Sequence, residues 1–131
     1  MIRSNRVRKA LAEGKTVFGP FVRLGSEAAM EVIGRAGFDF AIIDMEHGPL
    51  SVETAENLVR TAELTGIVPI IRVTDNEPAK IARALDSGAY GVQVPHVNSV
   101  EEAEKAVRAA KFAPQGARGL CRFVRAAQYS A

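Results

Sequence analysis

The sequence predicts an α/β fold with parallel strands, and two patterns carry this prediction. First, five of the six residues in Phe38–Ile43 are apolar, which is typical of a strand buried on both faces of a sheet. Second, helix, glycine and apolar strand follow one another along the chain, as they do where right-handed crossovers join parallel strands. The 131 residues are 47% hydrophobic and 24% charged, which fits one globular domain.

The start of the chain is expected to form a helix and a first strand. Val7 and Leu11 lie at helical spacing, which predicts a short amphipathic helix over residues 3–13 that ends at Gly14. The apolar run over residues 17–24 then predicts a strand.

Capping residues and glycines set the expected bounds of the next helices. Ser26 and Gly37 enclose a helix over residues 27–36, and Ser51 and Gly66 enclose one from 52 to about 64. Asp75 or Asn76 caps a helix with Pro78 in its first turn, Gly88 ends it, and Ser99 with Glu102 forms the capping box of a helix over residues 100–111. The apolar runs between these helices predict strands over residues 38–44, 67–73 and 90–97.

Two architectures share this pattern of four strand-then-helix units. One is a doubly wound open sheet, and the other is a closed (β/α)₈ barrel, which typically needs about 250 residues. Four units form a small open sheet or half of a barrel, and the local pattern leaves both open.

Composition narrows the classes of partner. The net charge is only +2, aromatic residues make up 6%, Trp is absent, and the basic residues are spread along the chain, so we expect no nucleic-acid partner. The single cysteine, Cys121, excludes an internal disulfide and a multi-cysteine metal site. The start of the sequence lacks the apolar core of a secretion signal, and no run approaches the roughly 20 apolar residues of a membrane span. We therefore expect a cytoplasmic protein without a membrane partner.

Polar residues follow the predicted strands at the end where α/β proteins bind ligands. Arg23, Asp44, His47, Arg72 and His96 lie at or just after the four strand ends, so we expect them around one pocket. This set suits proton transfer next to a carboxylate substrate. His47 would carry the proton, Arg72 would bind a carboxylate or an enolate, and a nearby Asp would hold the imidazole in place.

Each of these residues also has a simpler interpretation. His47 and His96 fit surface or capping positions, and Arg72 fits a structural ion pair, because a buried arginine needs a partner. Asp86 is expected to face solvent, and nothing in its local pattern indicates a function. A metal site built from this chain would have to use Asp44, Glu46 and His47, and no phosphate-binding glycine motif is present.

Four ordered motifs carry a resemblance to a known family. They are FDFAIIDMEHGPLS, PIIRV, ALDSGAYGVQVPHV and FAPQGARGLCRFVRAAQYS. With them the sequence resembles the HpcH/HpaI aldolases, the metal-dependent class II pyruvate aldolases. The resemblance implies a (β/α)₈ barrel of the TIM type, with residues 1–131 as a single partial barrel domain. In that domain residues 1–15 hold the first helix, 17–114 the first four β/α units, and 115–131 the start of the next segment.

The resemblance also implies an activity and roles for individual residues. The family cleaves or forms 4-hydroxy-2-oxo acids, such as 4-hydroxy-2-oxoheptanedioate, with pyruvate as the enolate and an aldehyde as the other product. His47 matches the base that moves the pyruvate C3 proton, and Arg72 matches the arginine that stabilises the transition state. Asp86 matches an aspartate that raises the basicity of the histidine, Asp44 matches an acid near the base, and His96 matches no functional position.

The family's metal site is expected to lie beyond this sequence. A divalent ion, Mg²⁺, Mn²⁺ or Co²⁺, is held in the family by a Glu and an Asp after the fifth and sixth strands, past Ala131. We therefore expect the 131-residue chain alone to be inactive or weak, since loss of an electrostatic stabiliser typically costs about 10²–10³ in rate. The family is usually hexameric, so a homo-oligomer is expected. The alternatives are a citrate-lyase-type or malyl-CoA-type lyase, or a non-catalytic half barrel that serves as an oligomerisation or binding module.

Overall fold

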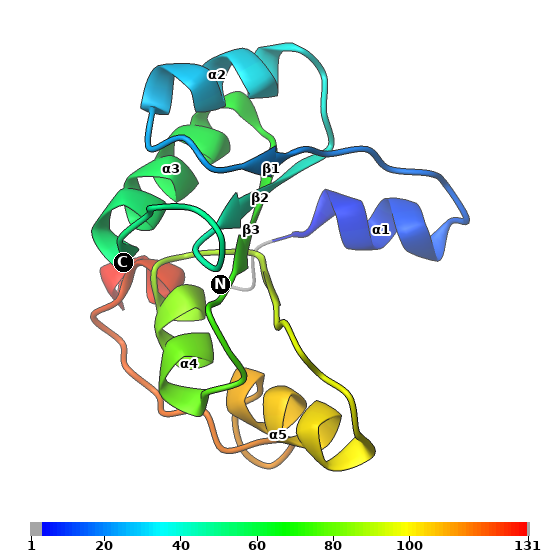
Figure 1. Ribbon diagram of the computed structural model, residues 1–131, viewed down its shortest axis with the longest axis vertical. Helices are drawn as coiled ribbons and strands as arrows, with labels where there is room; N and C mark the ends of the chain where they lie inside the picture. The colour runs from blue at the N-terminus through cyan, green and yellow to red at the C-terminus, as the bar shows by residue number, and fades with distance from the viewer. Residues whose placement is uncertain (1–3, 131) are drawn as a thin grey trace.

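The computed structural model describes residues 4–130 and contains a parallel sheet of four strands in the order β1-β2-β3-β4. Figure 1 labels β1, β2 and β3 at the centre of the molecule. Each strand pairs in parallel with the next one along the chain. The elements are α1 Arg6–Ala12, β1 Phe21–Val22, α2 Glu27–Arg35, β2 Phe40–Asp44, α3 Val52–Thr65, β3 Val68–Arg72, α4 Pro78–Asp86, β4 Gly91–Gln93, α5 Val100–Ala110 and the 3₁₀ segment η1 Arg125–Ser130.

The strand order decides between the two architectures that the sequence left open. A doubly wound sheet reverses its strand order at a switch point, whereas successive units of a (β/α)₈ barrel place each strand beside the one before it. Here the order is sequential, and α2, α3 and α4 lie along one side of the strands while α1 lies beyond the other (Figure 1). The α/β prediction is confirmed, and the arrangement is that of consecutive barrel units.

The two outer strands are shorter than the sequence predicted. β1 covers only Phe21–Val22 of the expected 17–24, because Pro20 has no N–H to donate to a ladder. β4 stops at Gln93, since Pro95 likewise lacks an N–H and His96 has a left-handed backbone with φ 55°. Hydrogen bonding to β2 continues irregularly on the N-terminal side of β1, where the amide of Ile42 donates to the carbonyl of Pro20 at 2.9 Å.

The helix ends follow the sequence signals except at the cap of α4 and in the predicted capping box of α5, where Oε2 of Glu102 accepts from the backbone amide of Asn98 instead of that of Ser99. The side chains of Ser26, Ser51 and Ser99 each accept a hydrogen bond from a backbone amide in the first turn of their helix. The predicted cap of α4 was wrong: neither Asp75 nor Asn76 occupies it, and Glu77 stands there without a side-chain cap bond. The side chain of Asn76 instead donates to the backbone carbonyl of Glu102 in α5 at 2.8 Å.

The core lies between the sheet and the helices on its covered face. Its largest fully buried side chains include Met30 of α2, Ile43 of β2, Leu58 of α3, Ile71 of β3 and Ile81 of α4. Burial of each such side chain stabilises the fold by about 1.5–3 kcal/mol. Within residues 4–130, no helix has both the length and the apolar character that a membrane crossing requires.

Candidate active site

The site begins at the end of β2, where Asp44 fixes the loop that follows. Its Oδ1 accepts hydrogen bonds from the backbone amides of Glu46 at 3.1 Å and His47 at 3.0 Å. Such turns are typical of aspartate, whose short side chain reaches backbone amides two and three residues ahead. A β-carbon at Gly48 would stand 2.2 Å from the carbonyl oxygen of Asp44, so the tight loop requires glycine at that position.

Strand register brings Asp44 opposite Arg72. The two residues pair across β2 and β3, and the guanidinium holds the carboxylate with two bonds, Nε to Oδ1 at 3.0 Å and Nη2 to Oδ2 at 2.7 Å. Only 1% of the Asp44 side chain is exposed. The hydrogen bond from Arg72, opposed by burial and helped by the two loop amides, lowers the pKa of Asp44 to about 2, and the same contact raises the pKa of Arg72. Both groups are therefore charged at neutral pH.

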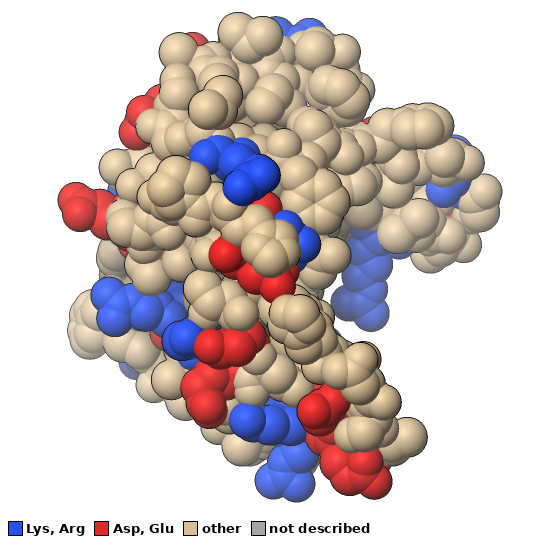
Figure 2. All heavy atoms as spheres, viewed as in Figure 1, with Lys and Arg blue, Asp and Glu red and all other residues tan. Residues whose placement is uncertain are grey.

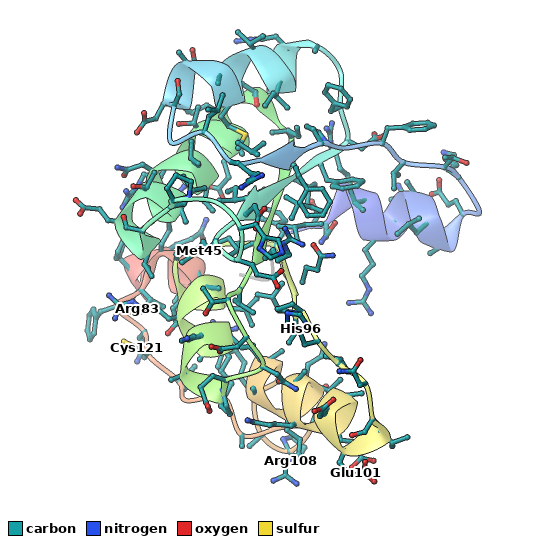
Figure 3. The ribbon with its side chains drawn as sticks, viewed as in Figure 1. Met45, Arg83, His96, Glu101, Arg108 and Cys121 are labelled. Atoms are coloured by element: carbon teal, nitrogen blue, oxygen red, sulfur yellow. The ribbon has the colours of Figure 1, made fainter. Side chains whose placement is uncertain are left out.

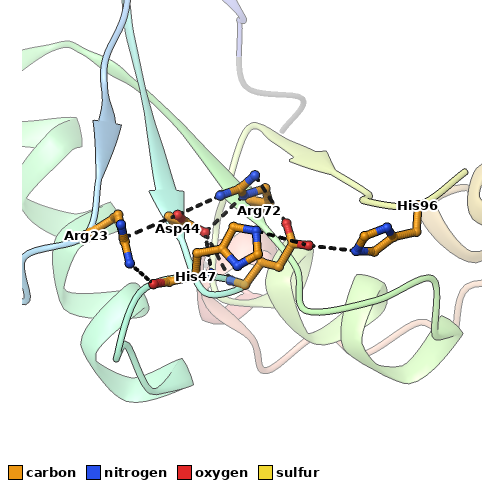
Figure 4. A network of polar contacts seen from close by, with 6 residues as sticks. Arg23, Asp44, His47, Arg72 and His96 are labelled. Atoms are coloured by element: carbon orange, nitrogen blue, oxygen red, sulfur yellow. Dashed lines mark hydrogen bonds and ion pairs between the residues drawn. The ribbon is translucent and has the colours of Figure 1, made fainter.

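Glu46 lies at the centre of a second set of contacts. Its Oε2 is 3.2 Å from Nη1 of Arg72, and its Oε1 is 3.0 Å from Nε2 of His96 and 3.7 Å from Nε2 of His47. The Glu46 side chain is 8% exposed, whereas those of His47 and His96 are 62% and 77% exposed. Glu46, Arg72 and His96 lie at or after the carboxyl ends of β2, β3 and β4, and Figure 4 draws the network that they form with Asp44 and His47.

The guanidinium of Arg72 keeps donors for a ligand. An arginine has five N–H groups. Two of them donate to Asp44, and Nη1 forms an ion pair with Glu46 at 3.2 Å, so at least two N–H groups remain for a ligand. The guanidinium also lies over the ring of Phe21 with its central carbon 4.7 Å from the ring centre, a cation–π contact that fixes its plane.

Arg23 borders the network on the side away from His96 (Figure 4). Its Nη2 donates to the backbone carbonyl of His47, and its Nε lies 3.9 Å from Oδ2 of Asp44. The side chain is 61% exposed. The formal charges of Arg23, Asp44, Glu46 and Arg72 add up to zero, so a negatively charged ligand does not meet a net negative site.

The structure thus brings Asp44, His47 and Arg72 together as the sequence predicted, but it separates Asp86 from them. Asp86 ends α4, and in a β/α unit the end of a helix lies opposite the carboxyl ends of the strands. Its carboxylate pairs with Arg118 at 2.5 Å. The expectation that Asp86 faces solvent was also wrong, because its side chain is only 30% exposed.

Sequence reasoning provided no indication of Phe21 as a member of the site, and it placed Glu46 and His96 at the strand ends without indicating their contact with each other. It expected an aspartate to orient the imidazole, whereas the carboxylate nearest to the His47 ring belongs to Glu46, and Asp44 is occupied by Arg72 and the loop amides. The sequence carries a signal for Glu46, which adjoins His47. It carries none for Phe21, whose contact with Arg72 depends on strand register, and the position of His96 after a strand does not show that its ring reaches Glu46.

No metal centre is formed by the part of the chain that the structure describes. Among residues 4–130, no three histidine, cysteine or acidic side chains are grouped so that they could hold an ion. The acids nearest to His47 are already engaged: Asp44 by Arg72 and two amides, and Glu46 by Arg72 and His96.

The surroundings of the site carry charges of both signs. In the space-filling view, acidic and basic atoms adjoin one another near the middle of the visible face, and no broad patch of one sign covers it (Figure 2). Figure 3 shows His96 near the middle of the molecule, whereas Glu101 and Arg108 lie out on α5. The cluster of charged side chains around Asp44, Glu46 and Arg72 is thus confined to the carboxyl ends of the strands.

Comparison with known proteins gives consistent matches. The model of the family described as HpcH/HpaI aldolase/citrate lyase matches residues 18–129. A 2-dehydro-3,6-dideoxy-6-sulfogluconate aldolase of Pseudomonas putida is 39% identical over 111 residues, which are 85% of this chain and 44% of that protein.

Solved structures agree with the sequence matches. An HpcH/HpaI aldolase/citrate lyase family protein of Burkholderia cenocepacia superposes with a TM-score of 0.90 at 32% identity, over 96% of this chain and 52% of that one. The citrate synthase SbnG superposes with a TM-score of 0.83 at 39% identity, over 87% of this chain and 46% of that one. The chain therefore spans about half the length of the proteins it matches.

Proposed function

Because the chain belongs to the HpcH/HpaI aldolase/citrate lyase family, we propose that it carries the proton-transfer half of the site of a carbon–carbon lyase. The reaction is the reversible cleavage of a 4-hydroxy-2-oxo acid into pyruvate and an aldehyde. Support for this activity comes from the aldolase relative and from one observation above all. An exposed imidazole, His47, lies beside a buried carboxylate and an anchored guanidinium at the carboxyl ends of the strands.

His47 acts as the base in this proposal. In cleavage it accepts the proton of the C4 hydroxyl, the C3–C4 bond breaks as the aldehyde carbonyl forms, and the bonding electrons pass to the pyruvate enolate. The same proton is then available for C3 of that enolate, so the atoms balance over one turnover. Glu46 stabilises the positive charge that the imidazole gains with the proton, since its Oε1 lies 3.7 Å from Nε2.

Arg72 binds the anionic end of the reacting system. Its two remaining N–H groups are suited to the enolate or carboxylate oxygens, because Asp44, Glu46 and Phe21 hold the guanidinium in one plane. Asp44 acts through Arg72 and the loop rather than on the imidazole. The effect of Asp86 on His47, which the family resemblance suggests, has no direct contact behind it within residues 4–130, where Asp86 pairs with Arg118.

The family's divalent ion does not fit the residues described. A cation needs carboxylate or imidazole groups that are free to coordinate it, and those of residues 4–130 form no such group. A metal would need other ligands, so we assign no step to it, and we expect the 131-residue chain to be slow by itself.

Exchange of the C3 protons of pyruvate with D₂O, followed by NMR, tests the proposal without an aldehyde. We expect slow exchange that the His47→Ala variant loses, since a general base typically contributes about 10²–10⁴-fold. Samples without metal and with Mg²⁺, Mn²⁺ or Co²⁺ show whether an ion adds to the rate. Exchange that is no faster than in buffer, or that His47→Ala leaves unchanged, contradicts the role of His47.

Carbon–carbon bond formation is the second candidate, because the citrate synthase SbnG is as similar in sequence as the aldolase relative. The two candidates differ in product. Release of pyruvate from a 4-hydroxy-2-oxo acid supports the lyase, whereas formation of citrate from oxaloacetate and an acetyl thioester supports the synthase.

The proposal also includes a cytoplasmic location. Cys121 is the only cysteine of the chain, and its thiol is exposed and unpaired, as is common in reducing compartments. Fractionation of cells that express a tagged copy tests this location.

A further inference from the structure

His96 has an unusual backbone conformation and a fixed place. Its φ is 55°, and among residues 4–130 the other non-glycine residues with positive φ lie at 128–130. Side chains rarely adopt this region, because the β-carbon crowds the backbone. Asn98 anchors the conformation, since its Nδ2 donates to the carbonyl of His96 at 3.0 Å and its backbone amide donates to Glu102 of α5 at 2.6 Å.

The contact that this conformation permits contributes little to the stability of the fold. Nε2 of His96 lies 3.0 Å from Oε1 of Glu46, but the His96 side chain is 77% exposed, and exposed ion pairs add little to folding stability. Strained backbone persists where the surrounding structure enforces it, and such residues cluster at functional sites.

Glu46 is held from two sides and faces a third group. Arg72 engages its Oε2 at 3.2 Å, and His96 engages its Oε1 at 3.0 Å. His47 faces the same Oε1 at 3.7 Å, and these are the charged or titratable side chains that contact Glu46 in the described network. Figure 4 shows His96 and Arg23 on opposite sides of the network. The position of the carboxylate beside His47 therefore depends on a basic side chain at each end of it.

We propose that His96 is a positioning residue that acts on His47 through Glu46. Its Nε2–H donates to Oε1 of Glu46 and prevents the carboxylate from turning fully toward Arg72. Oε1 then stays next to the imidazole of His47, which it orients. The inference rests on the proposed function, because an orienting carboxylate matters for catalysis only where His47 transfers a proton.

Two substitutions of His96 differ in how far their N–H donor reaches. His96→Gln keeps an N–H donor at about the same reach, whereas His96→Asn offers the same amide on a side chain one methylene shorter. Asparagine tolerates the left-handed backbone, and a glutamine adopts it in this chain at Gln128, with φ 51°, so both variants suit the loop. Val97→Ala, at the neighbouring position, is the matched control.

NMR of the His47 ring measures the effect directly. The chain has two histidines, so each His96 variant shows the ring signals of His47 alone. At a fixed pH of about 8, where an ordinary imidazole is mostly neutral, we expect His96→Asn to shift the ¹⁵N and ¹³C signals of the ring. We expect His96→Gln and Val97→Ala to leave them close to those of the original chain.

A double-mutant cycle with Glu46→Ala tests whether the effect passes through Glu46. If it does, His96→Asn shifts the His47 signals in the original chain but adds nothing once Glu46 is removed. Equal shifts with and without Glu46, or no shift in either, overturn the proposal.

Pyruvate C3 exchange gives the second readout and keeps the two proposals apart. We expect His96→Asn to lower the exchange rate by about 10- to 100-fold, as loss of a hydrogen-bonded group that orients a metal-binding side chain typically does, and His96→Gln to restore it. A non-additive NMR cycle without exchange in any variant supports the positioning role and overturns the catalytic one. Exchange that His96→Asn leaves unchanged overturns the positioning role.

Discussion

Asp44 is the residue through which the loop after β2 and the neighbouring strand are held together. Its pKa of about 2 lies below the ordinary 3.8 because Arg72 and two loop amides bond to the charged form. The folded state therefore binds this proton less readily than the unfolded state. The stabilisation is fully present above about pH 4 and is lost as the pH falls through about 2.

Substitution of Asp44 makes this dependence measurable. The shift corresponds to about 2 kcal/mol, since a tenfold change in proton affinity is worth about 1.4 kcal/mol. We expect Asp44→Asn to be less stable than the original chain by about that amount at pH 7 in urea unfolding. The difference should shrink as the pH is lowered from about 4 to about 2.

Asp75→Asn is the control for the acid titration. Asp75 pairs with Lys80 at 2.6 Å, but its side chain is 51% exposed, so its loss should change stability by less than about 1 kcal/mol. An Asp44→Asn difference that stays constant down to pH 2 would contradict the proposed cause of the low pKa.

The individual helices show how local signals succeed and where they fail. Ser51 and Gly66 bound α3 as predicted, because a hydroxyl that accepts an amide and a glycine with φ 77° act within one turn. The cap of α4 was missed, because the chain runs two residues further than Asp75 before the helix begins and Asn76 is drawn to α5. Competition from another helix is not visible in the local sequence.

The vacant cap of α4 predicts a stabilising substitution. Glu77 has the extended conformation of an N-cap, with φ −111° and ψ 123°, but makes no side-chain cap bond. Its pairing with Lys105 at 3.8 Å involves two half-exposed side chains and contributes little. We expect Glu77→Asp to raise the free energy of unfolding by about 1 kcal/mol. Ser99→Ala should lower it by a similar amount, because the Ser99 hydroxyl caps α5.

The loop between β2 and α3 gives a prediction of the opposite sign. In Gly48→Ala the new methyl group would meet the carbonyl oxygen of Asp44, and backbone cannot move aside as a flexible side chain can. We expect a loss of about 1–3 kcal/mol in unfolding free energy, together with slower pyruvate C3 exchange. Gly119→Ala has no atom within 4 Å of the added carbon and should stay within about 0.5 kcal/mol. Equal stability of the two variants would mean that the loop is not tightly closed on Asp44.

For the whole molecule, periodicity and glycine positions were enough to predict an α/β fold but not to choose its winding. That choice depends on which strands are neighbours, which the sequential order β1-β2-β3-β4 supplies, and the register of β2 against β3 pairs Asp44 with Arg72. The same register explains why Arg72, which the sequence left between a structural ion pair and a ligand-binding group, is anchored by Asp44 and still has free donors. Contacts made only through tertiary structure, such as that of Arg72 with Phe21, have no local sequence signal.

The open edges of the sheet lead to a prediction about assembly. In the described sheet β1 pairs only with β2 and β4 only with β3, and unpaired strand edges favour association. Phe18, just before β1, is 66% exposed. We expect the 14.1 kDa chain to form oligomers at micromolar concentrations in light scattering coupled to gel filtration.

Phe18→Lys should shift the mass toward the monomer, because charge at a strand edge opposes pairing. Leu64→Lys, at a 79% exposed position on α3, should leave the mass unchanged. A monomer at every concentration, or equal effects of the two lysines, would show that the edges do not drive assembly.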